Sequence, residues 1–332
     1  MGSRANYIIT EGNRHQIYFS HWGAQSVSRD FFFGPEIAIQ LVRSTRPVDQ
    51  MLNQVWAEGG AIIDLDAKRL RFFGGEWSEY DVQLRELSLE MMEISWDGWN
   101  VSWADEGMLD FARHMGLPLT TVQVKFEFLS SAFNPSALTL SPPASGPRSF
   151  VTIRYDDGVM RDAGLGCGAE PYLLAGPQLI DLLKPRPDDP IPEGKAWPHQ
   201  MIFLDVPQQT MWVALPRFGT VNSGAAPAIE ALWPGWRVHL HNGGMPLHLR
   251  LSGREPARWE RPMKELLQDL AKSIMIGDIN PQELITLASS GLSNPQINPS
   301  ARQEHRLDLP ENQRMERFLK LLAEWKRRHG RM

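Results

Sequence analysis

One phrase occurs twice in this chain, and the repetition constrains the fold more than any other feature. Residues 96–108 read WDGWNVSWADEGM, and residues 233–245 read WPGWRVHLHNGGM. The two openings are 137 positions apart, and this spacing aligns seven identical residues. Tryptophan and methionine are rare, so their agreement at one spacing predicts two copies of one module. The aligned pairs are Trp96 with Trp233, Gly98 with Gly235, Trp99 with Trp236, Val101 with Val238, Gly107 with Gly244, Met108 with Met245 and Gly116 with Gly253.

The similarity extends upstream in the same order. Residues 31–43, FFFGPEIAIQLVR, resemble residues 173–185, LLAGPQLIDLLKP. Two long copies indicate a tandem domain duplication, since a solenoid needs three or more short units. The stretch 134–149 is rich in Pro, Ser and Gly, as interdomain linkers are. We expect a first module over 1–120, a linker over 121–147, a second module over 148–256 and a helical tail over 257–332.

Each module is predicted to contain two hairpins, two helices and a final strand. Strands show apolar alternation, and Pro35 after Gly34 is placed to begin a helix. The second helix carries apolar residues at spacings of three or four. The order is therefore ββαββαβ, an α+β fold with helices packed on an antiparallel sheet. In the first module the expected elements are strands 7–10 and 16–20, a helix from 35, strands 61–65 and 70–73, a helix over 82–94, a strand over 100–104 and a helical turn over 108–114.

The repeated Trp-x-Gly-Trp falls where the second helix ends and the last strand begins. Glycine allows the positive φ that commonly ends a helix. Each indole can bury a large area and fix the helix on the sheet. Aromatic residues at such spacings usually belong to the core. We therefore expect Trp96, Trp99 and their counterparts to pack rather than to bind a ligand.

Composition and targeting signals restrict the class of protein. The chain is 42% hydrophobic and 22% charged, as in globular proteins. No apolar run approaches the roughly 18 residues that cross a bilayer, and the N-terminal residues lack the apolar core of a secretory signal. The single cysteine, Cys167, excludes an internal disulfide framework. These features predict a cytoplasmic protein without a membrane partner.

Charge is divided unevenly along the chain. Residues 261–332 contain 12 Lys and Arg against 9 Asp and Glu, which leaves 22 against 30 for residues 1–260. An acidic body argues against nucleic acid, whose phosphates need a basic surface. It favours a protein partner with a basic surface.

Candidate chemical groups have ordinary structural explanations. His239 and His241 alternate on a predicted strand and could bind zinc with His248, but a solvated strand face explains them better. Cys167 lacks an identifiable base and suits a buried position. Asp64 and Asp66 could be paired carboxylates, although a turn explains them better. Only Asp66 has an expected counterpart, at Asp205. We predict no catalytic residue, no bound metal and no cofactor.

The opening segments RANYIITEG (4–12) and YFSHWGA (18–24) resemble bacterial proteins. Together with the acidic body and many tryptophans, they resemble the large immunity proteins that bacteria keep in the cytoplasm to neutralise secreted polymorphic toxins. The resemblance implies a non-enzymatic inhibitor that binds a toxin tightly and occludes its active site. It does not select the enzymatic class of the toxin.

A second hypothesis is a hydrolase or transferase with a site between the two modules. A polar cluster in a cleft would favour it, whereas an acidic and aromatic face would favour the inhibitor. Candidate partner contacts are the acidic and aromatic residues of the first module. They are Trp22, Asp64, Asp66, Trp77, Glu79, Asp105 and Glu106.

Overall fold

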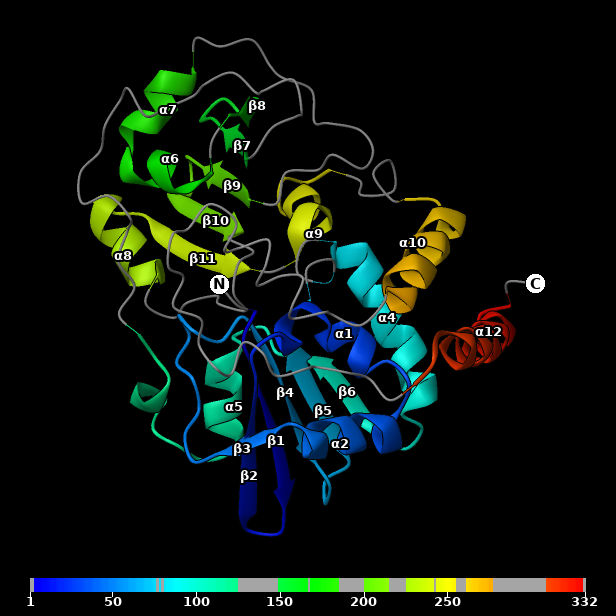
Figure 1. Ribbon diagram of the computed structural model, residues 1–332. Coiled ribbons are helices and arrows are strands. Elements are labelled where there is room, and N and C mark those ends of the chain that lie inside the picture. Colours follow the sequence, from blue (N-terminus) through cyan, green and yellow to red (C-terminus); the bar gives the residue numbers. More distant parts are fainter. Residues whose placement is uncertain are drawn as a thin grey trace, which may run out of the picture. The chain divides into compact units, whose positions relative to one another are not determined.

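The protein is described from a computed structural model that divides into two compact units (Figure 1). Unit 1 comprises residues 1–124 and 262–332, and unit 2 comprises residues 125–261. Each unit is described by itself below. The structure describes residues 3–75, 78, 81–124, 149–166, 168–184, 200–214, 225–241, 243–254, 261–276 and 309–330.

Unit 1 is built on a six-stranded sheet in the order β3-β2-β1-β4-β5-β6. Two hairpins, β1–β2 and β4–β5, are antiparallel, but β1 pairs with β4 and β5 with β6 in parallel. The strands are β1 (Ala5–Glu11), β2 (Arg14–Ser20), β3 (Arg46–Val48), β4 (Gly59–Asp64), β5 (Arg69–Phe73) and β6 (Asn100–Trp103). The helices are η1 (Gly23–Gln25), α1 (Val27–Asp30), α2 (Pro35–Ser44), α4 (Val82–Ser95), α5 (Met108–His114) and η2 (Leu119–Thr121).

Unit 2 is built on a five-stranded sheet in the order β11-β10-β9-β7-β8. Its hairpins β7–β8 and β9–β10 are antiparallel, while β7 pairs with β9 and β10 with β11 in parallel. The strands are β7 (Ser149–Arg154), β8 (Met160–Leu165), β9 (Gln200–Asp205), β10 (Thr210–Ala214) and β11 (Arg237–His241). The helices are α6 (Glu170–Leu174), α7 (Gln178–Leu183), α8 (Ala225–Leu232) and α9 (Gly244–Leu251).

The α+β class is confirmed, but the expected antiparallel sheets are wrong because both sheets are mixed. Replacing β2-β1-β4-β5-β6 by β8-β7-β9-β10-β11 gives the same order and the same strand directions. Parallel pairs arise because a helical connection returns the chain to the same end of the sheet before the next hairpin. Unit 1 adds the edge strand β3, whose Pro47 is tolerated at an edge.

Strand alternation divides each sheet into two apolar faces. In unit 1, Tyr7 and Ile9 of β1 face the core under α1, α2 and α4, whereas Ile8 faces the smaller core under α5. Figure 1 shows α5 on one side of this sheet and α2 and α4 on the other. In unit 2, Val151 faces α6, α7 and α8, and Phe150 faces α9. Each sheet is therefore the middle of three layers.

The repeated tryptophans form the same contacts in both units. The Trp96 indole N–H donates to the carbonyl of Phe31 at 2.7 Å, and that of Trp233 donates to Leu173 at 2.8 Å. Phe31 and Leu173 open the upstream segments that resemble each other. Trp96 meets Trp99 edge-on with ring centroids 5.1 Å apart.

The ring centroids of Trp233 and Trp236 lie 5.2 Å apart, also edge-on. Gly98 and Gly235 have φ of 77° and 85°, a region that favours glycine. The predicted packing role is confirmed.

The C-terminal helices α10 (Met263–Met275) and α12 (Glu311–Arg328) belong to unit 1. Phe318 packs on Phe32 with ring centroids 6.2 Å apart. The indole N–H of Trp325 donates to the Glu90 carboxylate of α4 at 3.0 Å. The predicted helical tail is thus confirmed in α10 and α12, and it completes the core of unit 1. In the described part of the chain, each helix is too short or too polar to span a membrane.

Candidate functional site

A pocket of about 420 Å³ lies at one end of the unit 1 sheet. It brings together the β1–β2 turn, the β4–β5 turn and the end of α5. Asp64 ends β4, Asp66 lies in the following turn, and His114 ends α5. His15 of β2 also lines the pocket. Two carboxylates and two imidazoles, distant in the sequence, therefore share one cavity.

Asp64 orients His114. Its Oδ2 lies 3.0 Å from Nε2 of His114, and its Oδ1 accepts a hydrogen bond from a backbone N–H of the β4–β5 turn at 2.8 Å. Burial lowers the pKa of His114, and the Asp64 charge raises it to a smaller extent. At pH 7 the ring is therefore neutral and donates from Nε2–H to the carboxylate. The pocket then carries the negative charges of both aspartates.

Asp66 and the arginines of β5 complete the local charge distribution. The carboxylate of Asp66 accepts a hydrogen bond from the backbone N–H of Gly12, which ties the two turns together. Arg69 and Arg71 are close enough to His114 to lower its pKa. Arg71 reaches Asp110 of α5 at 3.6 Å. A carboxylate has about four acceptor positions, so both aspartates keep capacity for a cationic donor.

The other predicted contact residues are distributed differently. Trp22 is 5% exposed and lies edge-on to His21 at 4.9 Å, so its prediction as a partner contact is corrected: the ring belongs to the core. Asp105 is exposed, and Glu106 forms an ion pair with Arg113 near the start of α5. Trp77 and Glu79 lie outside the described residues. Asp64 and Asp66 are thus the two predicted contacts that share the pocket.

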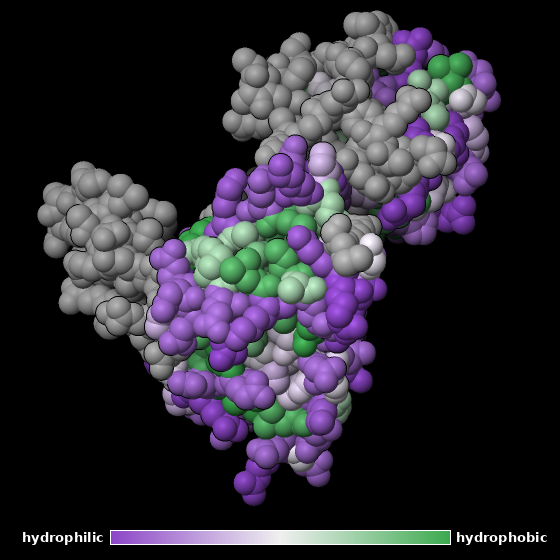
Figure 2. Space-filling view, turned by 90° about the vertical axis from the view of Figure 1, so that its right-hand side faces the viewer, coloured by the Kyte–Doolittle hydropathy of each residue, from purple (hydrophilic) through white to green (hydrophobic). Residues whose placement is uncertain are grey.

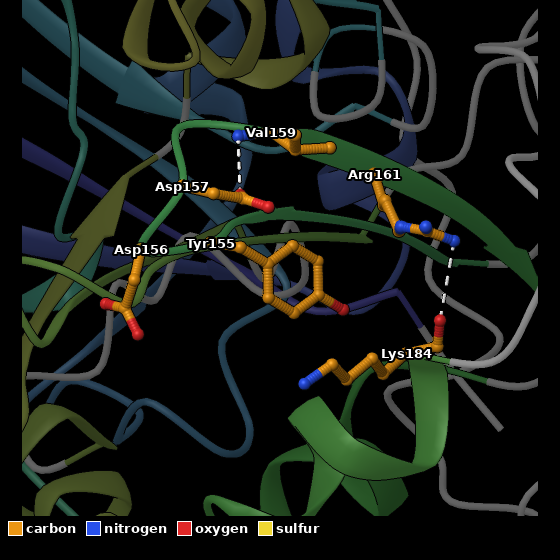
Figure 3. A pocket seen from close by; sticks show the side chains of 6 residues that line it. All are labelled: Tyr155, Asp156, Asp157, Val159, Arg161 and Lys184. Atoms are coloured by element: carbon orange, nitrogen blue, oxygen red, sulfur yellow. Dashed lines mark hydrogen bonds between the residues drawn. The ribbon is translucent and has the colours of Figure 1, made fainter.

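Unit 2 has a pocket of about 300 Å³ beneath its own first hairpin turn (Figure 3). Tyr155 extends into it, with Asp156 and Asp157 on the turn and Arg161 and Lys184 across from them. The Asp157 carboxylate accepts the Val159 N–H at 2.9 Å. Arg161 donates to the Lys184 carbonyl at 3.4 Å. This pocket has both charge signs, whereas the unit 1 pocket has its carboxylates beside neutral His114.

A buried polar chain crosses unit 2 on the face that α9 covers. Thr152 Oγ1 donates to Asp162 Oδ1 at 2.7 Å and lies 2.8 Å from His248 Nε2. A hydroxyl has one hydrogen and a carboxylate only accepts, so His248 donates from Nε2–H. Arg254 pairs with Asp162 at 2.7 Å. His248 is fully buried, and burial lowers its pKa to about 3.

The three histidines considered as zinc ligands differ in their burial and in their contacts. His239 is exposed and stacks on Trp212 with ring centroids 5.5 Å apart, whereas His248 is fully buried and bonds Thr152. Burial lowers the pKa of His241 to about 4. Within the described ranges, His, Cys, Asp and Glu form no group of three or more that could hold a metal ion. Cys167, the candidate nucleophile, lies outside those ranges.

The expected counterpart of Asp205 is also corrected. Asp205 ends β9 opposite Arg154, as Asp64 ends β4 opposite Thr10. Asp64, and not Asp66, therefore occupies the matching position. Asp205 pairs with Arg154 at 2.8 Å, whereas Asp64 pairs with His114.

Sequence reasoning missed His15 and His114. Histidine at the end of a short helix is unremarkable in a sequence, and its proximity to Asp64 depends on how α5 returns over the sheet. The sequence signal for this pocket was the pair of aspartates at a hairpin turn. It indicated where the pocket lies but not that the two histidines line it.

Comparison with protein-family models, with curated proteins and with solved structures found no match to this chain.

Proposed function

We propose that this chain is a non-enzymatic inhibitor, a bacterial immunity protein that acts in the cytoplasm and occludes the active site of a cognate toxin. The supporting observation is the pocket that contains Asp64 and Asp66. Both were selected from the sequence as partner contacts, and both line the same 420 Å³ cavity. The proposed partner presents a Lys or Arg side chain from a basic surface.

The electrostatics of the pocket suit a Lys or Arg side chain. Neutral His114 leaves the Asp64 charge uncompensated by an imidazolium at pH 7. Hydrogen bonds from backbone N–H groups hold both carboxylates in fixed directions. A preorganised carboxylate pair loses little freedom when a guanidinium binds, and charge-assisted hydrogen bonds are among the stronger ones.

We further propose that the two modules arose by tandem duplication. Support comes from the equal strand order of the two sheets, the matched Trp96 and Trp233 hydrogen bonds, and the close approach of a glycine to the helix end. A Cβ on Gly34 would lie 2.6 Å from the Ser95 carbonyl oxygen, and one on Gly176 would lie 2.8 Å from that of Leu232. Both glycines have positive φ.

The test is co-expression in a bacterial host with the protein encoded by the adjacent gene. We expect the neighbour alone to arrest growth and this chain to restore it. The double variant Asp64→Lys/Asp66→Lys should restore growth poorly, because it places cations where the partner's cation binds. The matched control Asp156→Lys/Asp157→Lys reverses two charges at the first hairpin turn of unit 2, between β7 and β8, and should protect normally.

Two results would contradict the proposal. One is a neighbour that is harmless by itself. The other is full protection by the Asp64→Lys/Asp66→Lys variant once circular dichroism shows that it folds. With a purified pair, the association rate should fall as salt rises, since the Debye length shortens to about 3 Å at 1 M.

One observation favours an enzyme as the second candidate. A carboxylate that orients a neutral histidine in a cavity is the arrangement of a general base and its positioning group, as a hydrolase or transferase would need. The Asp64–His114 pair has this arrangement. The alternatives separate at His114→Gln: a hydrolase loses turnover, whereas the inhibitor keeps its protective effect because both carboxylates remain.

A further inference from the structure

An apolar patch lies on the face of unit 1 that carries α10 and α12. Figure 2 shows it as a continuous hydrophobic area between bands of polar side chains. Three of its side chains are unusually exposed: Ile276 at 60%, Leu319 at 54% and Met315 at 39%. Partly buried Met275 and Leu322 adjoin them on the same two helices. Exposed apolar surface that is rimmed by polar residues often marks an interaction site.

Hydrogen bonds from two buried arginines hold the backbone beneath the patch. The Ile276 carbonyl accepts hydrogen bonds from Arg29 at 3.0 Å and from Arg314 at 2.9 Å. Both arginines are buried, so the backbone is fixed from two sides while the Ile276 side chain extends into solvent. On α12, Phe318 and Trp325 anchor the opposite face in the core. A preorganised surface loses little conformational entropy when a partner binds.

The stripe of α12 that borders the patch has nearly the same order of polar and apolar residues in both directions. It comprises Asn312, Met315, Leu319, Leu322 and Lys326, at spacings of three or four residues along an 18-residue helix. Leu319 is its centre, with one apolar neighbour and one polar end on each side. An antiparallel copy therefore places Leu319 on Leu319 and Met315 on Leu322.

The charges of α12 match the same arrangement. Glu311 and Glu316 in its first half are balanced by Arg314 and Arg317, whereas Lys326, Arg327 and Arg328 make its end basic despite Glu324. Antiparallel pairing places the basic end of each copy opposite the neutral start of the other, and the helix dipoles also favour this direction. A parallel pair would bring like charges together. Self-complementarity therefore selects a second copy of this chain over an unrelated apolar partner.

We propose that the patch is a homodimer interface in which two α12 helices pack antiparallel across a two-fold axis at Leu319. This interaction is independent of the proposed inhibitor function. The surface that binds the toxin lies at Asp64 and Asp66, and the surface that binds a second copy lies on the C-terminal helices.

Disulfide trapping tests the geometry directly. In a full-length chain with Cys167→Ser, Leu319→Cys places one thiol on the predicted axis, where mild oxidation should form a covalent dimer. The matched control is Val55→Cys, which replaces another apolar residue that is 56% exposed. We expect the control to remain monomeric. Equal cross-linking at the two positions, or none at Leu319→Cys, would overturn the proposal.

Sedimentation velocity tests the unmodified chain. Between about 1 and about 100 µM we expect the weight-average mass to rise from monomer towards dimer. Leu319→Glu, which faces its own negative charge across the axis, should weaken dimerisation about tenfold or more. Gln313→Glu, on the same helix but off the stripe, should not. A chain that stays monomeric at the highest concentration, or a Leu319→Glu variant that dimerises normally, would refute the interface.

Discussion

The two modules share a backbone plan but fill it with different chemistry. In unit 1 the face under α5 is apolar where Ile8 of β1 pairs with Ile17 of β2 and Phe111 covers them. At the matching places unit 2 has Thr152, Asp162 and His248, which form a hydrogen-bonded chain. The strand order and the tryptophan contacts are the same in both.

The difference shows which parts of the module determine its shape. Positive-φ glycines and the indole hydrogen bond specify backbone geometry, and few other residues can replace them. Core positions need complementary volume and satisfied polar atoms, which many combinations provide. A polar chain in place of an apolar one is stable only if every member has its partner. Unit 2 therefore depends on Arg254, which pairs with Asp162.

The largest expected effect is the unfolding of unit 1, but not of unit 2, when the C-terminal helices are removed. A chain that ends at Arg261 loses α10 and α12, whose buried side chains belong to the unit 1 core. At about 1.5–3 kcal/mol for each buried large apolar side chain, the loss is as large as the whole stability of a typical domain. We expect unit 1 to unfold and unit 2 to keep its structure. Hydrogen exchange measured by mass spectrometry would show this, and protection retained in β1 and β4 would contradict it.

The next largest expected effect is a loss of stability of equal size in the two units. Trp96→Ala and Trp233→Ala each remove a fully buried indole and leave a backbone carbonyl without its hydrogen-bond donor. We expect each to lower the free energy of unfolding by about 3–5 kcal/mol. Urea denaturation followed by circular dichroism provides the values. A nearly neutral result at one site would break the equivalence of the modules.

A third experiment replaces the buried polar residues of unit 2 by the apolar residues at the matching positions of unit 1. His248→Phe alone removes the donor to Thr152 in a buried site, and we expect a loss of about 1–3 kcal/mol. The triple variant Asp162→Ile/Thr152→Ile/His248→Phe copies the apolar residues of unit 1. It should recover part of that loss, because Thr152 and His248 no longer need polar partners, while Arg254, which loses Asp162, has a side chain that is 22% exposed to solvent. A triple variant less stable than His248→Phe would show that the two cores are not interchangeable.

The last expected effect is a pH dependence that is larger in unit 2 than in unit 1. Burial lowers the pKa of His248 to about 3 and that of His241 to about 4, both below the unfolded value near 6.5. The unfolded chain therefore binds more protons between these values, so stability is present above about pH 6.5 and is lost as pH falls towards 4. Each histidine contributes a slope of at most about 1.4 kcal/mol per pH unit.

Urea unfolding of unit 2 at pH 7.5 and pH 5 measures this slope. His248→Phe should reduce it, because Phe111 shows that the matching position accepts a residue that does not titrate. An unchanged slope in this variant would assign the acid sensitivity to other groups.

Local patterns predicted the hairpins and main helices because turn residues and apolar spacing act over short distances. Strands β1, β2, β4 and β5 and helix α4 lie close to their expected positions. The parallel pairings were missed because they depend on where each helical connection returns. The short strand β3 was missed because Pro47 argues against a strand except at an edge.

The candidate site was predictable only in part. Asp64 and Asp66 were found because alternating aspartates at a turn are visible in the sequence. His114 was not, because its contact with Asp64 exists only after α5 packs across the sheet. Trp22 was misjudged because an aromatic residue between His21 and Gly23 gives no sign of which side is buried.

The bond between Arg29 and the Ile276 carbonyl has a consequence for synthesis on the ribosome. Arg29 emerges early, but its partner lies 247 residues later in the chain. At about 5–20 residues per second, the interval is roughly 10–50 s, far longer than most small domains need to fold. All of unit 2 is made within that interval. During that time the N-terminal part of unit 1 lacks α10 and α12, and part of its core is exposed. Unit 2 can therefore finish folding before unit 1, and unit 1 is accessible to chaperones for the longer time.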